Sequence, residues 1–99
     1  MAEYRLTPRA EGDLEEIWRY TSEQWSTEQA EKYLEALIDA MELLAEDPSR
    51  GRSAESVRPG YLRRNVAAHV IFYKRAKYGV AIIRVLHGRM DFKSHFDPE

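Results

Sequence analysis

The spacing of apolar side chains changes halfway along the chain and divides it into a helical first half and a strand-rich second half. In the first half, apolar and aromatic side chains recur every three or four positions between charged ones. One such stripe runs from Ala10 to Trp25 and a second from Ala30 to Ala45. In the second half, apolar side chains form short runs rich in β-branched and aromatic residues, which favour strands. A further short strand is predicted at residues 3–6, before the helices.

Both predicted helices carry capping signals at their starts. Thr7 followed by Pro8 places a side-chain acceptor before a proline at the first helical position, where no N–H is needed. Ser26, with Gln29 three residues later, has the spacing of a capping box. The second helix is expected to end before Asp47-Pro48, because the residue ahead of a proline disfavours helical geometry. The short connection between the two stripes predicts a helical hairpin.

Three strands are predicted after a loop at residues 49–60: residues 61–66, 69–75 and 80–87. The connections between them are short, so neighbouring strands are expected to be antiparallel. The predicted fold is therefore α+β in the order β-α-α-β-β-β, with a helical hairpin packed on a small, mainly antiparallel sheet. We expect a single domain spanning residues 1–99.

The last two strands are apolar on both faces. Simple alternation divides the final strand into two apolar sets: Val80, Ile82 and Leu86 on one face, and Ala81, Ile83 and Val85 on the other. A sheet covered by helices on one side shows a cleaner alternation of apolar and polar residues. We therefore expect a second cover, either another protein chain or the C-terminal apolar residues Met90, Phe92 and Phe96.

The charges divide at the same place as the secondary structure. The 99 residues carry 15 Lys and Arg against 17 Asp and Glu, a net charge of −2. Residues 1–50 hold five basic and thirteen acidic side chains, a net of −8, and residues 51–99 hold ten and four, a net of +6. We interpret the acidic half as a solvated face and the basic half as the side that meets a partner.

The composition also excludes several classes of protein. A pI near 5.9 argues against a generally basic nucleic-acid-binding protein. The absence of cysteine excludes a disulfide scaffold, a thiol nucleophile and a Cys-ligated metal site. The start of the chain lacks a basic stretch followed by an apolar core, and the longest apolar runs are far shorter than the ~20 residues of a membrane-spanning helix. We expect a cytoplasmic protein without a membrane segment.

The densest group of polar side chains lies on and after the last strand: Arg84, His87, Arg89, Asp91 and His95. The spacing of His87, Asp91 and His95 suits metal ligands only in a helix, and the preceding strand argues against one, so no metal is expected. Arg and His beside Tyr73 form the kind of set that a metal-free ribonuclease needs. We favour the simpler interpretation, in which Arg84 pairs with a helix carboxylate and His87 with the backbone. No glycine-rich phosphate loop or hydrolase motif is present, and no cofactor is expected.

A second basic group follows the loop: Arg58, Arg63, Arg64, Lys74, Arg75 and Lys77. Alternate residues of a strand point to opposite faces, so these side chains are divided between the two sides of the sheet. Direct nucleic-acid binding is therefore not expected.

Several segments, taken in order along the chain, carry a family resemblance: Leu6-Thr7-Pro8-Arg9-Ala10, Asp13-Leu14, Ile17-Trp18, Tyr20, Ala30–Leu34, Leu44-Ala45, Pro48, Gly51-Arg52, Arg58, His69-Val70-Ile71-Phe72-Tyr73 and Ile82-Ile83-Arg84-Val85-Leu86-His87-Gly88-Arg89-Met90-Asp91. They resemble the ParE-type toxins of bacterial type II toxin–antitoxin modules over essentially the whole chain, and the closing run is the most specific part. The resemblance implies the RelE/ParE fold, with the same β-α-α-β-β-β order.

The same resemblance implies a function. It implies growth arrest through poisoning of DNA gyrase, an activity of binding rather than of enzyme catalysis. It also implies neutralisation by a ParD-type antitoxin, in a hetero-oligomer with a DNA-binding antitoxin dimer, whose amphipathic segment lies in an apolar groove. The alternative is a ribosome-dependent mRNA interferase of the RelE branch, against which the acidic total weighs. A third alternative is an interaction module that is not toxic.

Candidate site residues follow from these interpretations. Those for target binding and toxicity come from the closing run: Arg84, His87, Arg89, Met90 and Asp91. Those for antitoxin binding come from the helical stripes and the sheet: Trp18, Trp25, Tyr33, Leu37, Ile71 and Tyr73. Core packing is the simpler interpretation for each member of the second group.

Overall fold

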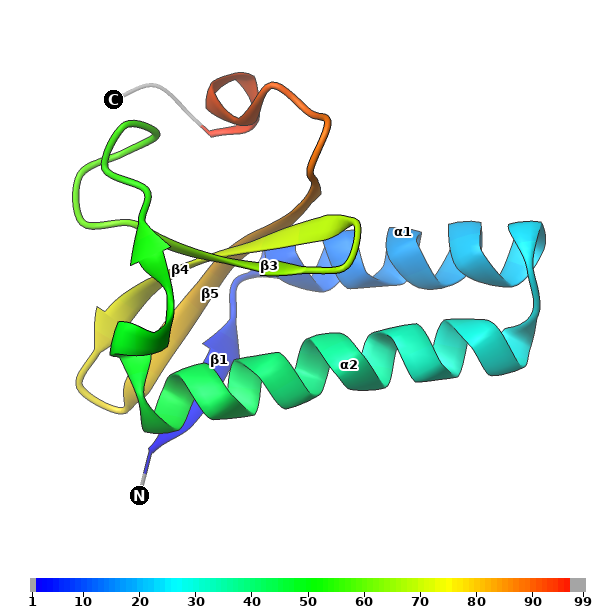
Figure 1. The fold of residues 1–99 in the computed structure, drawn as a ribbon, viewed down its shortest axis with the longest axis horizontal. Helices are drawn as coiled ribbons and strands as arrows, with labels where there is room; N and C mark the ends of the chain where they lie inside the picture. The colour runs from blue at the N-terminus through cyan, green and yellow to red at the C-terminus, as the bar shows by residue number, and fades with distance from the viewer. Residues whose placement is uncertain (1, 97–99) are drawn as a thin grey trace.

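A pair of helices packs against a five-stranded sheet in the computed structural model of the chain, which describes residues 2–96 (Figure 1). The elements, in chain order, are β1 (Glu3–Leu6), α1 (Pro8–Gln24), α2 (Thr27–Glu46), a short 3-10 helix η1 (Pro48–Arg50), β2 (Arg52–Ser53), β3 (Leu62–Val66), β4 (His69–Ala76), β5 (Gly79–His87) and a second 3-10 helix η2 (Phe92–His95). The predicted α+β order is confirmed, with one short strand added.

The two helices begin where the capping signals predict. The side chain of Thr7 accepts a hydrogen bond from the Ala10 N–H (3.1 Å), and that of Ser26 accepts one from the Gln29 N–H (3.0 Å). Each cap satisfies one of the N–H groups that the first helical turn leaves without a partner. Figure 1 shows the connected ends of α1 and α2 projecting beyond the sheet. The turn between them therefore lies away from the main core.

The strands lie in the order β1-β5-β4-β3-β2, so the first strand of the chain pairs with the last. β1 and β5 are parallel, and the other pairs are antiparallel. The additional strand β2 falls inside the predicted loop at residues 49–60. It has two residues, Arg52 and Ser53, which pair with Arg63 and Leu62 of β3. Two residues are too few to produce a periodic pattern, and for this reason the strand is absent from the sequence-based prediction.

A β-bulge in β5 corrects the predicted distribution of its side chains. Phe72 lies opposite Arg84, whereas the next residue of β4, Tyr73, lies opposite Ile82. Ile83 is thus an extra residue, and the alternation of β5 shifts by one position there. As a consequence, Val85 joins Val80 and Ile82 in the core beneath the helices. Leu86, predicted on the face of Val80 and Ile82, packs instead on the opposite face, beside Val70 and Phe72.

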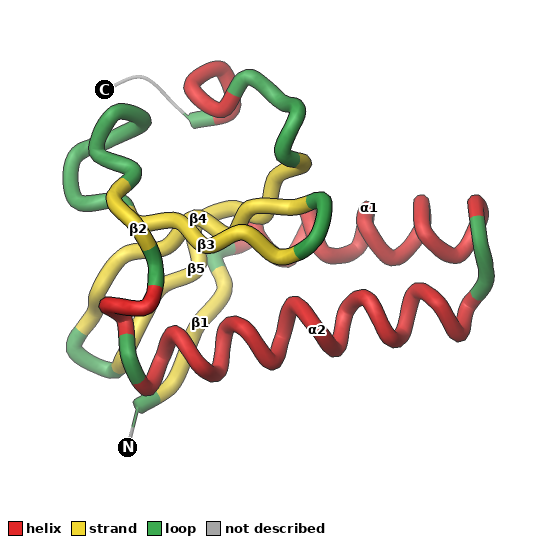
Figure 2. Tube along the Cα trace, in the orientation of Figure 1, coloured by secondary structure: helices red, strands yellow, loops and turns green. Residues whose placement is uncertain are grey.

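The chain covers the second face of its sheet with its own C-terminal segment. On this face Phe72 is fully buried, and the rings of Phe92 and Phe96 meet it edge-on at centroid distances of 4.9 and 5.3 Å. Figure 2 shows η2 and the loop after β2 together on the side of the sheet away from α2. Of the two expected covers, the tail is therefore the one in this structure. Met90, expected in the cover, is exposed instead.

Two glycines provide a matched test of this packing. A Cβ at Gly51 would overlap the Tyr73 hydroxyl and lie 2.7 Å from the Arg63 carbonyl oxygen, whereas a Cβ at Gly12 in α1 would meet nothing within 4 Å. We predict that Gly51→Ala lowers the free energy of unfolding by about 1–3 kcal/mol through overpacking. Gly12→Ala should raise it by about 0.5–1 kcal/mol, because alanine loses less backbone entropy in a helix. Urea denaturation of both variants measures this, and equal effects would contradict the packing described.

Candidate functional site

Arg84 of β5 and Asp13 of α1 form a bidentate ion pair between the sheet and the helices. The Arg84 Nε and Nη2 groups donate to the two carboxylate oxygens of Asp13 over 2.8 and 2.9 Å. Asp13 also accepts the backbone N–H of Val85 (2.9 Å), and Arg84 Nη1 donates to the carbonyl of His95 (2.8 Å). The side chains of Arg84 and Asp13 are only 13% and 14% exposed, so solvent screens the pair weakly. These contacts, the Asp13–Arg84 junction, join α1, β5 and the C-terminal segment.

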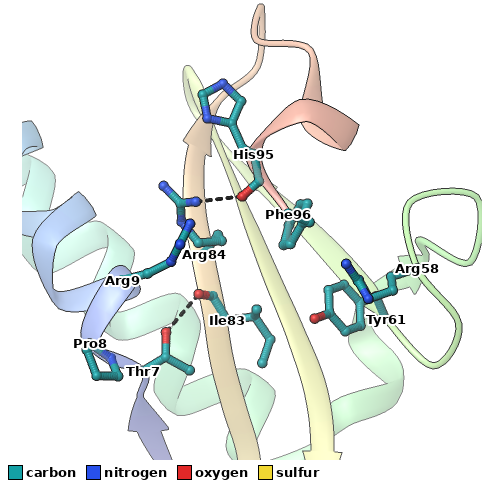
Figure 3. Close-up of a pocket in the computed structure, with 9 residues that line it drawn as sticks. All are labelled: Thr7, Pro8, Arg9, Arg58, Tyr61, Ile83, Arg84, His95 and Phe96. Atoms are coloured by element: carbon teal, nitrogen blue, oxygen red, sulfur yellow. Dashed lines mark hydrogen bonds between the residues drawn. The ribbon is translucent and has the colours of Figure 1, made fainter. Parts of the chain in front are cut away.

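A pocket of about 470 Å³ opens beside this junction, on the face of the sheet that the tail covers (Figure 3). Its residues come from the start of α1, the loop before β3, the bulge of β5 and the described part of the C-terminal segment: Thr7, Pro8, Arg9, Arg58, Tyr61, Ile83, Arg84, His95 and Phe96. In Figure 3, Arg9 and Arg84 stand on one side of the pocket and Arg58 and Tyr61 on the other. We call it the arginine pocket.

Thr7 and Ile83 form one wall of the arginine pocket and fix the start of α1 against β5. The Thr7 hydroxyl donates to the Ile83 carbonyl over 2.8 Å while its oxygen accepts the N–H of Ala10. The same residue thus caps the helix and ties it to the bulge. Arg9, two residues later, is thereby held at the pocket, near the end of the helix where the macrodipole is positive.

A second group of candidate side chains, the histidine cluster, lies at the C-terminal end of β5, three residues beyond Arg84. The Tyr33 hydroxyl of α2 is 2.6 Å from Nδ1 of His69 and accepts the backbone N–H of Ala68 over 3.2 Å. The rings of His69 and His87 meet edge-on at a centroid distance of 5.3 Å, since the two residues are paired across β4 and β5. His87 Nδ1 accepts the backbone N–H of Arg89. That bond fixes the tautomer in which the Nδ1 of His87 is unprotonated.

Burial shifts the titration of this cluster. It lowers the pKa of His69, because desolvation disfavours the imidazolium; the neighbouring His87 lowers this pKa further, and Asp13 opposes the shift. Burial also raises the pKa of Tyr33, and the N–H of Ala68 opposes that shift by stabilising the phenolate. The neutral forms of both groups are therefore favoured, and the tautomer of His69 decides which of the two groups donates the hydrogen bond between them.

The histidine cluster lines one side of a groove of about 440 Å³ between the helical hairpin and the β3–β4 turn. The other side carries two exposed aromatic residues of the hairpin, Tyr20 (65% exposed) and Trp25 (76% exposed). Large aromatic side chains with this exposure are typical of binding surfaces. We call this feature the aromatic groove.

The structure divides the residues predicted for toxicity between these places. Arg84 lies in the junction and His87 in the histidine cluster, which confirms that the first pairs with a helix carboxylate and the second with the backbone. Arg89, Met90 and Asp91 lie exposed in the turn after β5. That turn continues directly from the histidine cluster, because the Met90 N–H donates to the His87 carbonyl over 3.0 Å.

The residues predicted for antitoxin binding also fall into two classes. Trp18 and Trp25 are exposed and Tyr33 is half-buried, and the last two line the aromatic groove. Leu37, Ile71 and Tyr73 have no exposed surface and belong to the core beneath the helices. These three offer no surface to a partner, and their role is the core packing that is the simpler interpretation of the sequence.

The sequence-based predictions of site residues do not include Asp13 or His69, and they do not group Arg9 with Arg58. Asp13 is one of thirteen acidic residues in the first half, and nothing in the pattern marks it as the partner of Arg84. Arg9 and Arg58 lie far apart in the sequence and come to one pocket through the tertiary fold. His69 begins an apolar strand. The predicted antiparallel pairing of this strand with the last one is the signal that could have placed His69 opposite His87.

Two further features follow from the described residues. Neither helix within residues 2–96 is long and apolar enough to cross a membrane. No three metal-ligating side chains gather as a metal site in that range, and His87, Asp91 and His95 belong to separate structural elements.

Comparison with known proteins accords with this architecture. The chain matches the family described as the ParE toxin of the type II toxin–antitoxin system parDE over residues 4–92. It is 43% identical over 95 residues to Toxin ParE1 of Caulobacter vibrioides, covering 96% of this chain and 98% of the relative. It is 42% identical over 89 residues to Toxin ParE1 of Mycobacterium tuberculosis (89% and 91% covered) and 30% identical over 92 residues to Toxin ParE of Escherichia coli (92% and 89% covered).

A solved structure, of the chromosomal ParDE TA system from P. aeruginosa, shares the fold. It superposes with a TM-score of 0.76 at 18% identity, covering 88% of this chain and 96% of that one. The α+β architecture is therefore that of the RelE/ParE superfamily. With the family match and the relatives at 30% identity or more, the chain belongs to the ParE toxins of type II toxin–antitoxin systems.

We expect that breaking the Asp13–Arg84 junction lowers the stability of the fold strongly. Asp13→Ala leaves a weakly exposed guanidinium without its carboxylate and removes the acceptor of the Val85 N–H. We predict a loss of about 3 kcal/mol in the free energy of unfolding. The exposed neighbour Glu15 provides the control, since Glu15→Ala should change stability by less than about 0.5 kcal/mol. If urea denaturation shows the same loss of unfolding free energy in Asp13→Ala and Glu15→Ala, the junction does not stabilise the fold more than an exposed carboxylate does.

The histidine cluster predicts a pH dependence of stability. Because the pKa of His69 is lowered in the folded state, the unfolded chain binds more protons below its ordinary pKa of about 6.5. Stability should therefore be fully present above that pH and fall as the pH decreases below it. His69→Asn keeps an acceptor near Tyr33 and should reduce the stability difference between pH 7.5 and 5.5. His95→Asn, away from the cluster, should keep the full difference; an unchanged slope in His69→Asn would contradict this assignment.

Proposed function

We propose that this toxin arrests growth by binding DNA gyrase in the cytoplasm, and that it catalyses no reaction. The observation that carries the proposal is the engagement of Arg84 by Asp13 and by the His95 carbonyl. An arginine that stabilises a phosphate in a ribonuclease must direct its N–H donors at the substrate. Tyr73, the hydroxyl of that alternative, is fully buried and donates to the Pro48 carbonyl over 2.7 Å. Both observations favour a binding mechanism over an mRNA interferase.

The target-binding surface that we propose is the exposed turn after β5. Arg89, Met90 and Asp91 present a cation, an apolar side chain and an anion there, with His87 at the base of the turn. An exposed methionine beside charged groups suits a protein partner, because its flexible side chain adapts to an apolar surface. Arg84 supports this region from within β5 and is better described as a positioning residue.

The neutralising partner that we propose is a ParD-type antitoxin, in a hetero-oligomer with a DNA-binding antitoxin dimer. Support comes from the matched family and from the similar solved structure, both of which are described as parts of a ParDE system. The aromatic groove supplies an apolar surface suited to an amphipathic helix, with Trp25 at its rim and Tyr33 within it. Trp18 extends the exposed aromatic surface along α1.

The gyrase mechanism has a direct test in vitro. Purified toxin, added in excess over gyrase, should block supercoiling of relaxed plasmid or trap cleaved DNA, and prior addition of antitoxin should prevent either effect. No effect at excess would contradict gyrase poisoning. Cuts in translated mRNA, mapped by primer extension, would support the interferase alternative instead.

Arg89 offers a residue-level test of the target surface. Arg89→Ala should raise the toxin concentration that gives half-inhibition of gyrase at least about 10-fold, as is typical of a hot-spot residue in a protein–protein interface. Antitoxin affinity should stay unchanged, because the aromatic groove remains intact. Lys77→Ala, at the exposed β4–β5 turn, serves as the control and should match the wild type. Loss of gyrase inhibition and antitoxin binding together would indicate misfolding rather than a target contact.

A further inference from the structure

Four arginines meet at the outer edge of the sheet, where the short strand β2 pairs with β3 (Figure 2). They line one pocket of about 240 Å³: Arg50, Arg52, Arg63 and Arg64. Successive strand residues point to opposite faces of a sheet, yet Arg63 and Arg64 both reach this pocket. β2 pairs only with Leu62 and Arg63, so β3 is itself the edge of the sheet from Arg64 onward, and side chains from both faces turn around it. We call these four arginines the basic edge.

The positive charges of the basic edge are only weakly compensated. Arg50 lies 3.5 Å from a carboxylate oxygen of Asp47, in a pair whose side chains are 52% and 51% exposed and are therefore screened by solvent. Within residues 2–96, the other three arginines form no ion pair. Arg64 donates instead to the backbone carbonyl of Arg50 over 3.2 Å, which leaves its charge without a counter-ion. The edge therefore carries a local excess of positive charge.

Two of these cations are held against each other. Arg52 and Arg63 lie directly opposite in the β2–β3 pair, and like charges in that position destabilise a sheet. The guanidinium of Arg63 lies over the rings of Phe92 and Phe72, at 5.3 and 6.0 Å from their centroids. Its buried Nε has no hydrogen-bond partner among the described residues. Cations kept together at a cost in stability are typical of a site that binds an anion.

The remaining lining of the basic edge indicates which class of anion fits. Besides the four arginines it contains only Gly51 and Asn65, so no apolar side chain contributes to this pocket. A protein–protein interface has an apolar core, whereas an interface with nucleic acid is polar and positively charged. Arginine and asparagine side chains are common partners of backbone phosphates, and a guanidinium binds a phosphate with two parallel hydrogen bonds. The chemistry of the lining therefore favours nucleic-acid phosphates over a protein surface.

The basic edge also lies close to the turn after β5. Asn65 pairs with Val70 of β4, and Val70 pairs with Leu86, the residue before His87. Neighbouring strands are about 4.8 Å apart, so the basic edge and the end of β5 are separated by about 10 Å. A target that binds the turn can therefore present a second, anionic surface to the basic edge at the same time.

We propose that the basic edge binds the phosphate backbone of the DNA duplex that gyrase holds. This inference rests on the proposed gyrase target and adds a second contact to it, in which the turn after β5 meets the enzyme and the basic edge meets its DNA. The net charge of −2 gives the free toxin no long-range attraction to DNA. Binding to gyrase supplies the high local concentration at which a few phosphate contacts form.

The test measures the affinity of fluorescently labelled toxin for gyrase alone and for gyrase saturated with a linear DNA duplex. For the wild type, the duplex should tighten binding at least about 10-fold, and this enhancement should decrease as the salt concentration rises. Arg52→Gln/Arg64→Gln should keep the affinity for gyrase alone and lose the enhancement. The single variant Arg52→Gln should lose part of it, because one phosphate contact remains.

A matched control removes two exposed cations from the helices. Arg19→Gln/Lys32→Gln changes the net charge by the same amount, and its enhancement should stay within about 3-fold of that of the wild type. Thermal unfolding separates a binding role from a structural one. Because Arg52→Gln removes the repulsion with Arg63, this variant should unfold at the same temperature as the wild type or at a higher one.

The outcomes separate this proposal from the proposed function. If the wild type binds neither form of gyrase, the proposed target is wrong, and the DNA contact with it. If the wild type binds gyrase with and without the duplex equally well, or if Arg52→Gln/Arg64→Gln keeps the enhancement, the DNA contact is wrong and the proposed function stands. If toxin without gyrase binds a single-stranded RNA more tightly than a DNA duplex of the same length, and the two substitutions abolish that binding, the basic edge is an RNA site and the proposal is overturned.

Discussion

The pairing of Asp13 with Arg84 is the interaction on which the arrangement of the three layers depends. It is formed between residues 71 positions apart, and it fixes α1 against β5 and β5 against the tail. The two side chains are largely shielded from solvent. Removal of either one therefore leaves the other as an uncompensated charge, which destabilises the fold. The bulge at Ile83 follows the same constraint, since it turns Val85 toward the helices immediately after Arg84. The position of the tail, and with it the arginine pocket, therefore depends on this junction.

The division of charge along the sequence becomes a division between the layers of the fold. Helices α1 and α2 carry most of the acidic residues of the −8 half, on their outer faces. The +6 half forms most of the sheet and the tail, where three arginines converge on one pocket and two histidines adjoin the aromatic groove. A small domain that buries both faces of its sheet has little surface left for partners. The contacts proposed for target and antitoxin lie at the rims of the buried sheet, in the turn after β5 and in the aromatic groove.

Features with local physical causes could be predicted from the sequence. The helices follow from long 3.6-residue stripes and from the caps at Thr7 and Ser26, and the strands follow from short β-branched runs. The two-sided burial of β4 was visible in its apolar run. The bulge could not be predicted, because it is set by hydrogen bonding to β4 rather than by the composition of β5. Nor could the arginine pocket, since Arg9 and Arg58 come together only after α1, β5 and the tail have packed. The fold was thus largely predictable, whereas the sites were predictable only as residue types.

The central claim, that one ion pair couples the helices to the sheet and tail, is tested most directly by a double-mutant cycle. The free energies of unfolding of the wild type, Asp13→Ala, Arg84→Ala and the double variant yield the coupling between the two side chains. We predict a coupling of about 2–3 kcal/mol, near the top of the range for contacting residues, with the double variant little worse than either single one. A coupling below about 0.5 kcal/mol would contradict the claim.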